Sequence, residues 1–201
     1  RSCLVGSEMC IRDSYYIMVL TKTPICNFGE KPHSFSLKGV DDKIYKLEDC
    51  LGDKGTVIMF ICNHCPYVKA IIKNIVDDTN NLRNLGVNAI AIMSNDTKNY
   101  PDDSFDKMKD FAKDNKFNFP YVIDETQEIA KKFGAVCTPD FFGYNSNNEL
   151  QYRGRMRELK ELKPVSDDES DLFKAMKLIA QTGKGPKNQI PSMGCNIKWF
   201  N

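Results

Sequence analysis

The chain has 201 residues, which is enough for one domain with a substantial hydrophobic core. Its 28 lysine and arginine residues balance 27 aspartate and glutamate residues, so electrostatics gives no reason to expect nucleic acid or an anionic membrane as a partner. No apolar run approaches the roughly 20 residues that cross a bilayer. The composition therefore predicts one globular domain that binds neither nucleic acid nor membrane.

The first residues differ in character from the rest of the chain. The stretch RSCLVGSEMCIRDS has no strand alternation and no helical stripe, and it resembles a translated linker scar. We expect residues 1–17 to be a non-native or disordered leader, with Met18 as the true start. A disordered native tail is the alternative reading. Residues 18–201 are expected to form a single domain.

Cysteine usage indicates the compartment. No signal peptide follows Met18. Six cysteines lie beyond it, and only Cys62 and Cys65 are close together in sequence. This pattern is too sparse for a disulfide scaffold and predicts a reducing, cytoplasmic location.

The predicted elements alternate between strands and helices. The run TVIMFIC is almost continuously apolar, as in a strand buried on both faces, and helically spaced apolar residues follow it. In chain order we expect a hairpin (35–37 and 44–47), a strand (56–62), a helix with apolar positions from 68 to 85, a strand (87–94), a helix (101–116), a strand (119–124), a helix (125–134), a hairpin (141–144 and 150–153), a helix starting near 166–168 and an irregular tail (183–201).

This order predicts an α/β fold. Crossover helices between buried strands imply a parallel central portion, and the hairpins add antiparallel strands, so we expect a mixed sheet flanked by helices. The cysteine pair follows the first buried strand directly. In open α/β sheets, this carboxyl end of a strand is where sites are usually found.

The segment CNHCP carries the chemistry. A thiol attacks as the thiolate, and we expect Cys62 to lie at the start of the helix, where unpaired N–H groups and the helix dipole stabilise an anion. A protonated His64 adds positive charge, and Pro66 suits an early helical position. Cys65 lies one turn further and can close a disulfide with Cys62. The sequence therefore predicts a redox dithiol, with Cys62 as nucleophile, Cys65 as resolving thiol and His64 tuning the pKa.

A metal site is the alternative for such a pair. Zinc needs two more ligands, but the chain has no second Cys-x-x-Cys and only one other histidine, His33. A zinc or copper module would have to combine Cys62 and Cys65 with a third thiol, for which Cys137 is a candidate. We favour redox chemistry and expect neither a metal nor another cofactor.

Three motifs together resemble a known family. The segments CNHCP, CTPDFF and GCNIKW, at this spacing, are similar to the thioredoxin fold and, within it, to the alkyl hydroperoxide reductase and thiol-specific antioxidant superfamily of peroxiredoxin-like proteins. The resemblance implies that Thr138–Pro139 forms a cis-proline loop facing the two cysteines, where the backbone of Thr138 pairs with an extended substrate segment. It also places Cys137 near the pair.

The resemblance is not complete. Thr56 stands where thioredoxin has its buried acid, so the usual proton acceptor for Cys65 is missing. The peroxidase signature P-x-x-x-T/S-x-x-C also fails, because Gly55 and Met59 occupy its two positions before Cys62. A thiol peroxidase is therefore the second choice.

Two cysteines outside the pair have open roles. Cys137 is either a third redox thiol or a buried apolar side chain, which is common for a free cysteine. Cys195 lies in a tail that either packs in an ordinary way or folds back over the active site, with Trp199 holding it there.

We thus predict a thiol–disulfide oxidoreductase with an antioxidant or redox-homeostasis role. Its expected partners are a protein or small-molecule disulfide and a recycling reductase.

Overall fold

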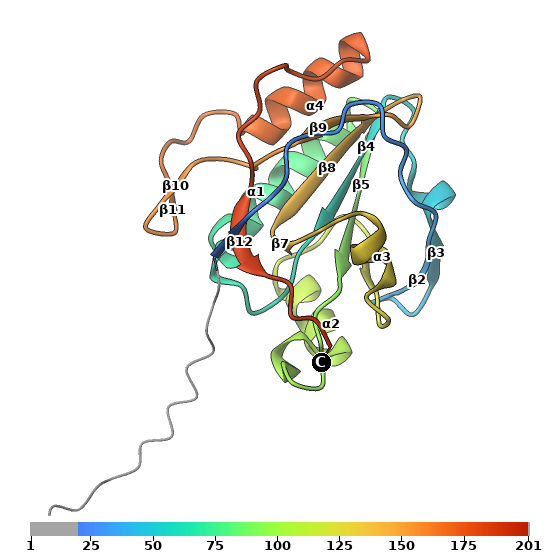
Figure 1. Ribbon diagram of the computed structural model, residues 1–201, viewed down its shortest axis with the longest axis vertical. Coiled ribbons are helices and arrows are strands. Elements are labelled where there is room, and N and C mark those ends of the chain that lie inside the picture. Colours follow the sequence, from blue (N-terminus) through green and yellow to red (C-terminus); the bar gives the residue numbers. More distant parts are fainter. Residues whose placement is uncertain (1–19, 201) are drawn as a thin grey trace, which may run out of the picture.

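The computed structural model describes residues 20–200, so the predicted leader 1–17 and Met18 lie outside the described residues. A seven-stranded sheet in the order β3-β2-β6-β5-β4-β8-β9 forms the centre (Figure 1). Strands β4, β5 and β6 are parallel, and the other pairs in this sheet are antiparallel. The strands are β2 (Ser36–Gly39), β3 (Ile44–Lys46), β4 (Gly55–Phe60), β5 (Val87–Met93), β6 (Tyr121–Ile123), β8 (Asp140–Asn145) and β9 (Leu150–Arg153). The predicted mixed α/β sheet is confirmed.

Helices cover both faces of this sheet. Helices α1, α2 and α4 contribute to one hydrophobic cluster, whereas α3 and the short 3-10 helix η1 contribute to the other. Figure 1 shows α1 and α4 behind the sheet and α3 in front of it. Their bounds are α1 (Pro66–Arg83), α2 (Phe105–Asp114), α3 (Glu128–Lys132), α4 (Asp171–Thr182), η1 (Leu47–Cys50) and, before α2, η2 (Pro101–Asp103).

Strand β4 lies at the centre of the core. All six of its residues are buried, because β5 and β8 flank it and each of its faces meets a hydrophobic cluster. Val57 and Met59 belong to one cluster, and Ile58 and Phe60 to the other. This confirms the reading of TVIMFIC as a doubly buried strand, and it fixes where the following segment leaves the sheet.

Helix α4 begins later than predicted. Its first residue is Asp171, and the side chain of Ser170 accepts a hydrogen bond from the backbone N–H of Phe173. This is a regular N-cap, which ends the preceding loop and starts the helix at that point. The loop itself contains a short antiparallel pair that the sequence analysis missed, β10 (Leu159–Lys160) with β11 (Lys163–Pro164).

The prediction of a wholly irregular tail is wrong. Strand β12 (Met193–Asn196) lies between β1 (Leu20–Lys22) and β7 (Cys137–Thr138) in a second, three-stranded sheet. In Figure 1, β12 and β1 run side by side in front of the lower part of the sheet. Four residues with a glycine and a cysteine carry no clear strand pattern, so only the pairing with β1 and β7 makes them a strand.

Among the described residues, no helix combines the length and apolar character that crossing a bilayer requires.

Candidate active site

The two cysteines lie where β4 passes into α1. Helix α1 begins at Pro66, and Cys65 is its N-cap with extended backbone angles (φ −63°, ψ 121°). The expectation that Cys62 occupies the start of the helix is therefore wrong. A residue before proline is disfavoured in the helical region, so Cys65 cannot continue the helix backwards, and Cys62 lies three residues before the cap.

Cys65 receives the stabilisation that was expected at Cys62. Possible thiol donors surround its sulfur, and Cys195 Sγ lies 3.2 Å away. Hydrogen bonds from Cys195 and from Cys62 lower the pKa of Cys65, and the backbone N–H of Val68 in the first turn of α1 acts in the same direction. A protonated Cys65 can instead donate to the carbonyl oxygen of Thr138, at 3.1 Å. The hydrogen bonds outweigh the burial of the thiol, so the net effect is a lowered pKa of Cys65.

Cys62 is held in the protonated form. Its side chain is fully buried, and this burial raises the pKa of the Cys62 thiol well above its usual range. Its hydrogen bond to Cys65 and the negative charge of Asp103 raise that pKa further, whereas Thr138 Oγ1, 3.3 Å from Cys62 Sγ, lowers it. The two pKa shifts therefore run in opposite directions, and Cys65 loses its proton more readily than Cys62.

His64 interacts more closely with Asp103 than with Cys62. Its Nδ1 lies 2.6 Å from Asp103 Oδ2 and 3.9 Å from Cys62 Sγ. One ring nitrogen faces both groups, so while it donates to the carboxylate it cannot accept a proton from the thiol. The Asp103 charge also offsets a positive charge on His64, which weakens the predicted effect of His64 on Cys62.

Asp103 is the site residue that the sequence analysis missed. Its side chain is fully buried, and Oδ1 accepts from the backbone N–H groups of Asn63 and His64, at 2.8 and 3.2 Å. Oδ2 also accepts from Asn95 Nδ2 at 2.8 Å. The sequence did offer one signal for Asp103, which is that it follows β5. The carboxyl ends of neighbouring parallel strands share one edge of the sheet, so residues after β5 can lie near the cysteines that follow β4.

The loop opposite the cysteines has the predicted form. The Thr138–Pro139 peptide bond is cis, and Thr138 contacts both sulfurs. The backbone of Thr138, however, pairs with Cys195 of β12 rather than standing free for a substrate. Beyond the strand, Trp199 lies beneath Lys131 of α3, whose Nζ is 5.6 Å from the ring centroid. Of the two readings left open for the tail, the pairing of β12 with β7 agrees with the one in which the tail folds back against this loop.

Cys137 lies beside the site without a contact to Cys62 or Cys65 among the interactions that the structure gives. Its Sγ is 3.7 Å from the carbonyl oxygen of Pro139, and burial raises its pKa well above the usual value. Cys195, and not Cys137, is thus the third thiol next to the pair.

The potential metal ligands do not match the set expected from sequence. Within residues 20–200, Cys62, His64 and Asp103 are the set whose ligand atoms all lie within 4.8 Å of one another. Three thiols therefore do not converge on a common point there. The close contact between His64 and Asp103 already satisfies two of those groups, so this arrangement favours thiol chemistry over a metal centre.

A cavity of about 280 Å³ adjoins the cis-proline. Pro139 lines it together with Tyr67 of α1 and Met193 of β12, and the cationic side chains of Lys22, Arg155 and Arg157 also contribute.

Solved structures assign the class of protein. A secreted disulfide oxidoreductase from Mycobacterium tuberculosis, homologous to E. coli DsbE, matches 71% of this chain and 93% of its own, with a TM-score of 0.53 at 15% identity. At this identity the likeness concerns the fold alone. It agrees with the sheet order and the cis-proline loop, and this chain is a thioredoxin-fold protein.

The family follows from the sequence match. Residues 28–157 match the AhpC/TSA family, and because this is more than half of the chain, the protein belongs to that family. An uncharacterized conserved protein from Geobacillus kaustophilus is 37% identical over 91% of this chain and 97% of its own, with a TM-score of 0.86. A hypothetical protein from Sinorhizobium meliloti 1021 is 28% identical over 90% and 98%, with a TM-score of 0.83. No curated protein matches the chain. Family and fold together support a redox enzyme in general.

Proposed function

We propose that this protein is a thiol–disulfide oxidoreductase whose redox couple is Cys62 and Cys65. The observation that best supports this is the pair of buried sulfurs facing the cis-proline loop, with Cys62 Sγ 3.3 Å from Thr138 Oγ1 and Cys65 Sγ 3.1 Å from Thr138 O. Both sulfurs therefore contact the same residue, which supports their lying on the same side of the loop, as a disulfide between them requires.

The cycle begins with a proton transfer within the pair. The proton of Cys62 passes along its hydrogen bond to Cys65, and the Cys62 thiolate then attacks a substrate disulfide. One S–S bond breaks, one thiolate of the substrate leaves, and a mixed disulfide forms at Cys62. The first substrate thiolate takes the proton from Cys65, and the Cys65 thiolate then attacks Cys62 Sγ and releases the second substrate thiolate. The substrate disulfide has gained two electrons, and the protein holds a Cys62–Cys65 disulfide.

The same steps in reverse oxidise a substrate dithiol. A recycling reductase, itself a dithiol, would return the protein to the reduced state in the forward direction. We propose a protein or small-molecule disulfide as substrate and a cytoplasmic location, and the cycle needs no cofactor. The role of His64 as a group that tunes the pair, and of Thr138, Pro139 and Cys137 as substrate-facing residues, belongs to this proposal.

A thiol peroxidase is the second candidate, because the chain belongs to the AhpC/TSA family, whose motifs it shares with peroxiredoxin-like proteins. Two features weigh against it. Gly55 and Met59 replace the residues of the peroxidase signature, and burial raises the pKa of Cys62 in the closed arrangement. Peroxide consumption with a recycling dithiol measures this activity directly.

The test is to detect the Cys62–Cys65 disulfide and to trap the mixed disulfide between Cys62 and a substrate. After equilibration in glutathione redox buffers and digestion with trypsin, the peptide 55–69 should lose two hydrogen masses reversibly, because both cysteines lie on it. Cys65→Ser, incubated with oxidised insulin chains, should accumulate a mixed disulfide at Cys62.

Cys50→Ser is the matched control, since Cys50 is also buried but bonds to the carbonyl oxygen of Lys46. It should behave like the wild type in both assays. If peptide 55–69 stays reduced in every buffer, or if stoichiometric metal accompanies the reduced protein, the proposal is wrong.

A further inference from the structure

We propose that Cys195 is a third redox-active thiol, which takes over the disulfide from Cys62–Cys65 and forms a Cys65–Cys195 bond. This inference rests on the proposed function, because it gives that disulfide a second position in the same chain. Cys65 then has two alternative disulfide partners, Cys62 in the loop before α1 and Cys195 in the C-terminal strand β12.

The distance between the sulfurs carries the inference. Cys65 Sγ and Cys195 Sγ lie 3.2 Å apart, although 130 positions separate them in the sequence. A disulfide is about 2.05 Å long, so the two atoms need to approach by only about 1 Å. Both side chains are almost fully buried, at 0% and 2% exposure, so competing thiols from solvent are excluded in the closed arrangement.

Other buried cysteines have a different environment. Cys50 Sγ lies 3.3 Å from the carbonyl oxygen of Lys46, and Cys137 Sγ lies 3.7 Å from that of Pro139. Such contacts are ordinary for a buried free cysteine. Cys195 instead faces a sulfur that belongs to the redox couple.

The chain holds Cys195 in this position from both sides. Ser192 Oγ donates to the carbonyl oxygen of Pro139 at 2.7 Å, and the N–H of Ile197 donates to the carbonyl oxygen of Val136 at 3.1 Å. Between them Gly194 lies so close to β7 that an added Cβ would meet Thr138 O at 2.1 Å. A glycine is therefore required for β12 to bring the next residue, Cys195, against Cys65.

Electrostatics favours the transfer only after the first disulfide has formed. In the reduced protein the hydrogen bond to Cys65 is the main reason why the pKa of Cys195 is raised, and Lys198 acts in the opposite direction. Once Cys65 is joined to Cys62 it carries no negative charge, so this cause disappears. Cys195 then loses its proton more readily.

The transfer is a balanced exchange. The Cys195 thiolate attacks Cys65 Sγ in line with the Cys62–Cys65 bond. The Cys65–Cys195 bond forms, the Cys62–Cys65 bond breaks, and Cys62 leaves as a thiolate that takes up the proton lost by Cys195. The protein has one disulfide before and after, so no outside oxidant is needed, and Cys62 is again free to attack a second substrate disulfide.

The experiment uses Cys62→Ser, in which Cys65 can no longer pair with residue 62. Full-length protein is reduced, treated with diamide, which oxidises thiol pairs, and digested with trypsin. We expect a disulfide between peptide 55–69, which carries Cys65, and peptide 188–198, which carries Cys195. A thiol count in denaturant should show two more thiols lost than in the double variant Cys62→Ser/Cys195→Ser.

Wild-type protein provides a second measurement in case Cys62→Ser folds poorly. Oxidised wild type should contain the link between peptides 55–69 and 188–198, and Cys195→Ser should contain only the bond within 55–69. Cys50→Ser should retain both bonds.

The outcomes separate the two proposals. If Cys195→Ser forms the bond within 55–69 but neither wild type nor Cys62→Ser links 55–69 to 188–198, the third thiol is not redox-active and the proposed function stands. If Cys195→Ser never forms the bond within 55–69, the proposed function itself fails. A link between 55–69 and 188–198 in Cys62→Ser supports the inference only when Cys195→Ser also forms the bond within 55–69, because the transfer starts from that bond.

Discussion

At the scale of single residues, burial and hydrogen bonds shift the pKa values of the two thiols in opposite directions, and the charge of Asp103 adds to the shift at Cys62. Asp103 is a buried carboxylate that lies within 4.8 Å of the Cys62 sulfur and is hydrogen-bonded to His64. A like charge at this range disfavours a thiolate. The Asp103 charge therefore adds to burial in raising the pKa of Cys62.

Asp103→Asn should lower the pKa of Cys62. The substitution keeps an oxygen for the N–H groups of Asn63 and His64 but removes the negative charge that raises this pKa. We expect this pKa to fall, because a nearby negative charge disfavours the thiolate. The measurement is the pH dependence of iodoacetamide labelling at Cys62, resolved by mass spectrometry.

Asp102→Asn is the matched control. Asp102 is exposed, and its contact to the site is through its backbone carbonyl, which accepts from Asn63 Nδ2 at 3.0 Å. It should leave the labelling profile of Cys62 unchanged. An Asp103→Asn profile identical to the wild type would show that this carboxylate does not control the thiol.

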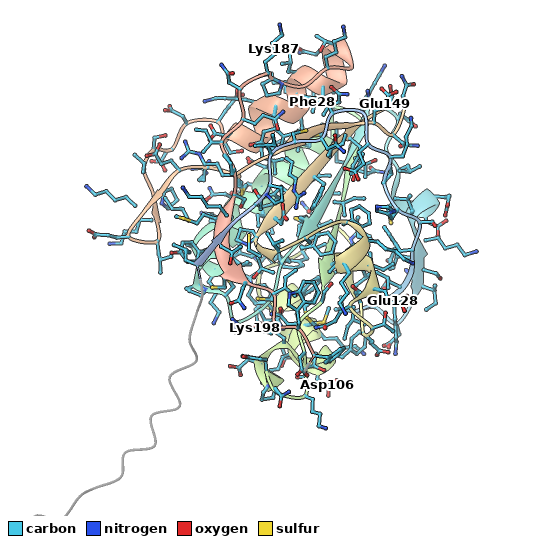
Figure 2. The ribbon with its side chains drawn as sticks, viewed as in Figure 1. Phe28, Asp106, Glu128, Glu149, Lys187 and Lys198 are labelled. Atoms are coloured by element: carbon cyan, nitrogen blue, oxygen red, sulfur yellow. The ribbon has the colours of Figure 1, made fainter. Side chains whose placement is uncertain are left out.

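At the scale of secondary-structure elements, β12 determines access to the pair. It lies against the Thr138 backbone, and both active-site cysteines are fully buried. The chain continues past β12 through Lys198, whose N–H donates to Asn95 Oδ1 at 2.9 Å and whose carbonyl oxygen accepts from the N–H of Asp96 at 2.8 Å. Figure 2 shows Lys198 beyond the lower end of β12, near the loop that leads to α2. A substrate can reach Cys62 only after part of this segment moves.

Gly194→Ala should open this segment. The new Cβ would lie 2.1 Å from the carbonyl oxygen of Thr138, which is backbone and cannot rotate away. Overpacking typically costs 1–3 kcal/mol, and 1.4 kcal/mol corresponds to a factor of ten. We expect native-state alkylation of Cys62 and Cys65 to become roughly tenfold faster, measured by quenched labelling and peptide mapping.

Met193→Ala tests whether any change in β12 has this effect. Met193 neighbours Gly194 but is 40% exposed, so its truncation should change the labelling rates little. Equal rates for Gly194→Ala and the wild type would mean that β12 does not limit access.

At the scale of the whole molecule, a buried ion pair connects the site to the far part of the sheet. Asp140 begins β8 directly after the cis-proline and is fully buried, and its Oδ2 accepts from Arg153 Nη2 of β9 at 2.9 Å. Arg153 also donates to the carbonyl oxygen of Gly134 after α3. Burial outweighs the attraction to Arg153 and raises the pKa of Asp140 from 3.8 to about 6.

The raised pKa of Asp140 predicts how stability varies with pH. Since the folded state holds the proton more tightly than the unfolded chain, this group stabilises the fold below about pH 4. This contribution declines as the pH rises and is lost above about pH 6. The total loss in the free energy of unfolding is about 3 kcal/mol, at 1.36 kcal/mol per pKa unit. The free energy of unfolding in urea, measured from pH 4 to 7, should decline in this way relative to Asp140→Asn, which does not titrate.

A constant difference between wild type and Asp140→Asn over this pH range would contradict the raised pKa. A difference that grows with pH would mean that the attraction to Arg153 outweighs burial.

The sequence by itself determined the architecture and the position of the dithiol. An uninterrupted apolar run such as TVIMFIC can be satisfied only at the centre of a covered sheet, so β4 and the Cys62–Cys65 pair at its end could be inferred from local pattern. The cis form of Thr138–Pro139 came with the family resemblance, because a proline alone does not specify it.

The tertiary structure decided how the site is charged and covered. Cys195 meets Cys65 across 130 positions, and Asp103 meets His64 across 39, and such contacts leave no periodic signal in the chain. Pro66 begins the helix and makes Cys65 its N-cap through a steric effect on the preceding residue. The pKa is lowered at Cys65, and not at Cys62 as expected, chiefly by the hydrogen bonds from Cys195 and Cys62. Spacing along the chain reveals which groups can react, whereas the pKa of each thiol depends on neighbours that only folding brings within a few ångströms.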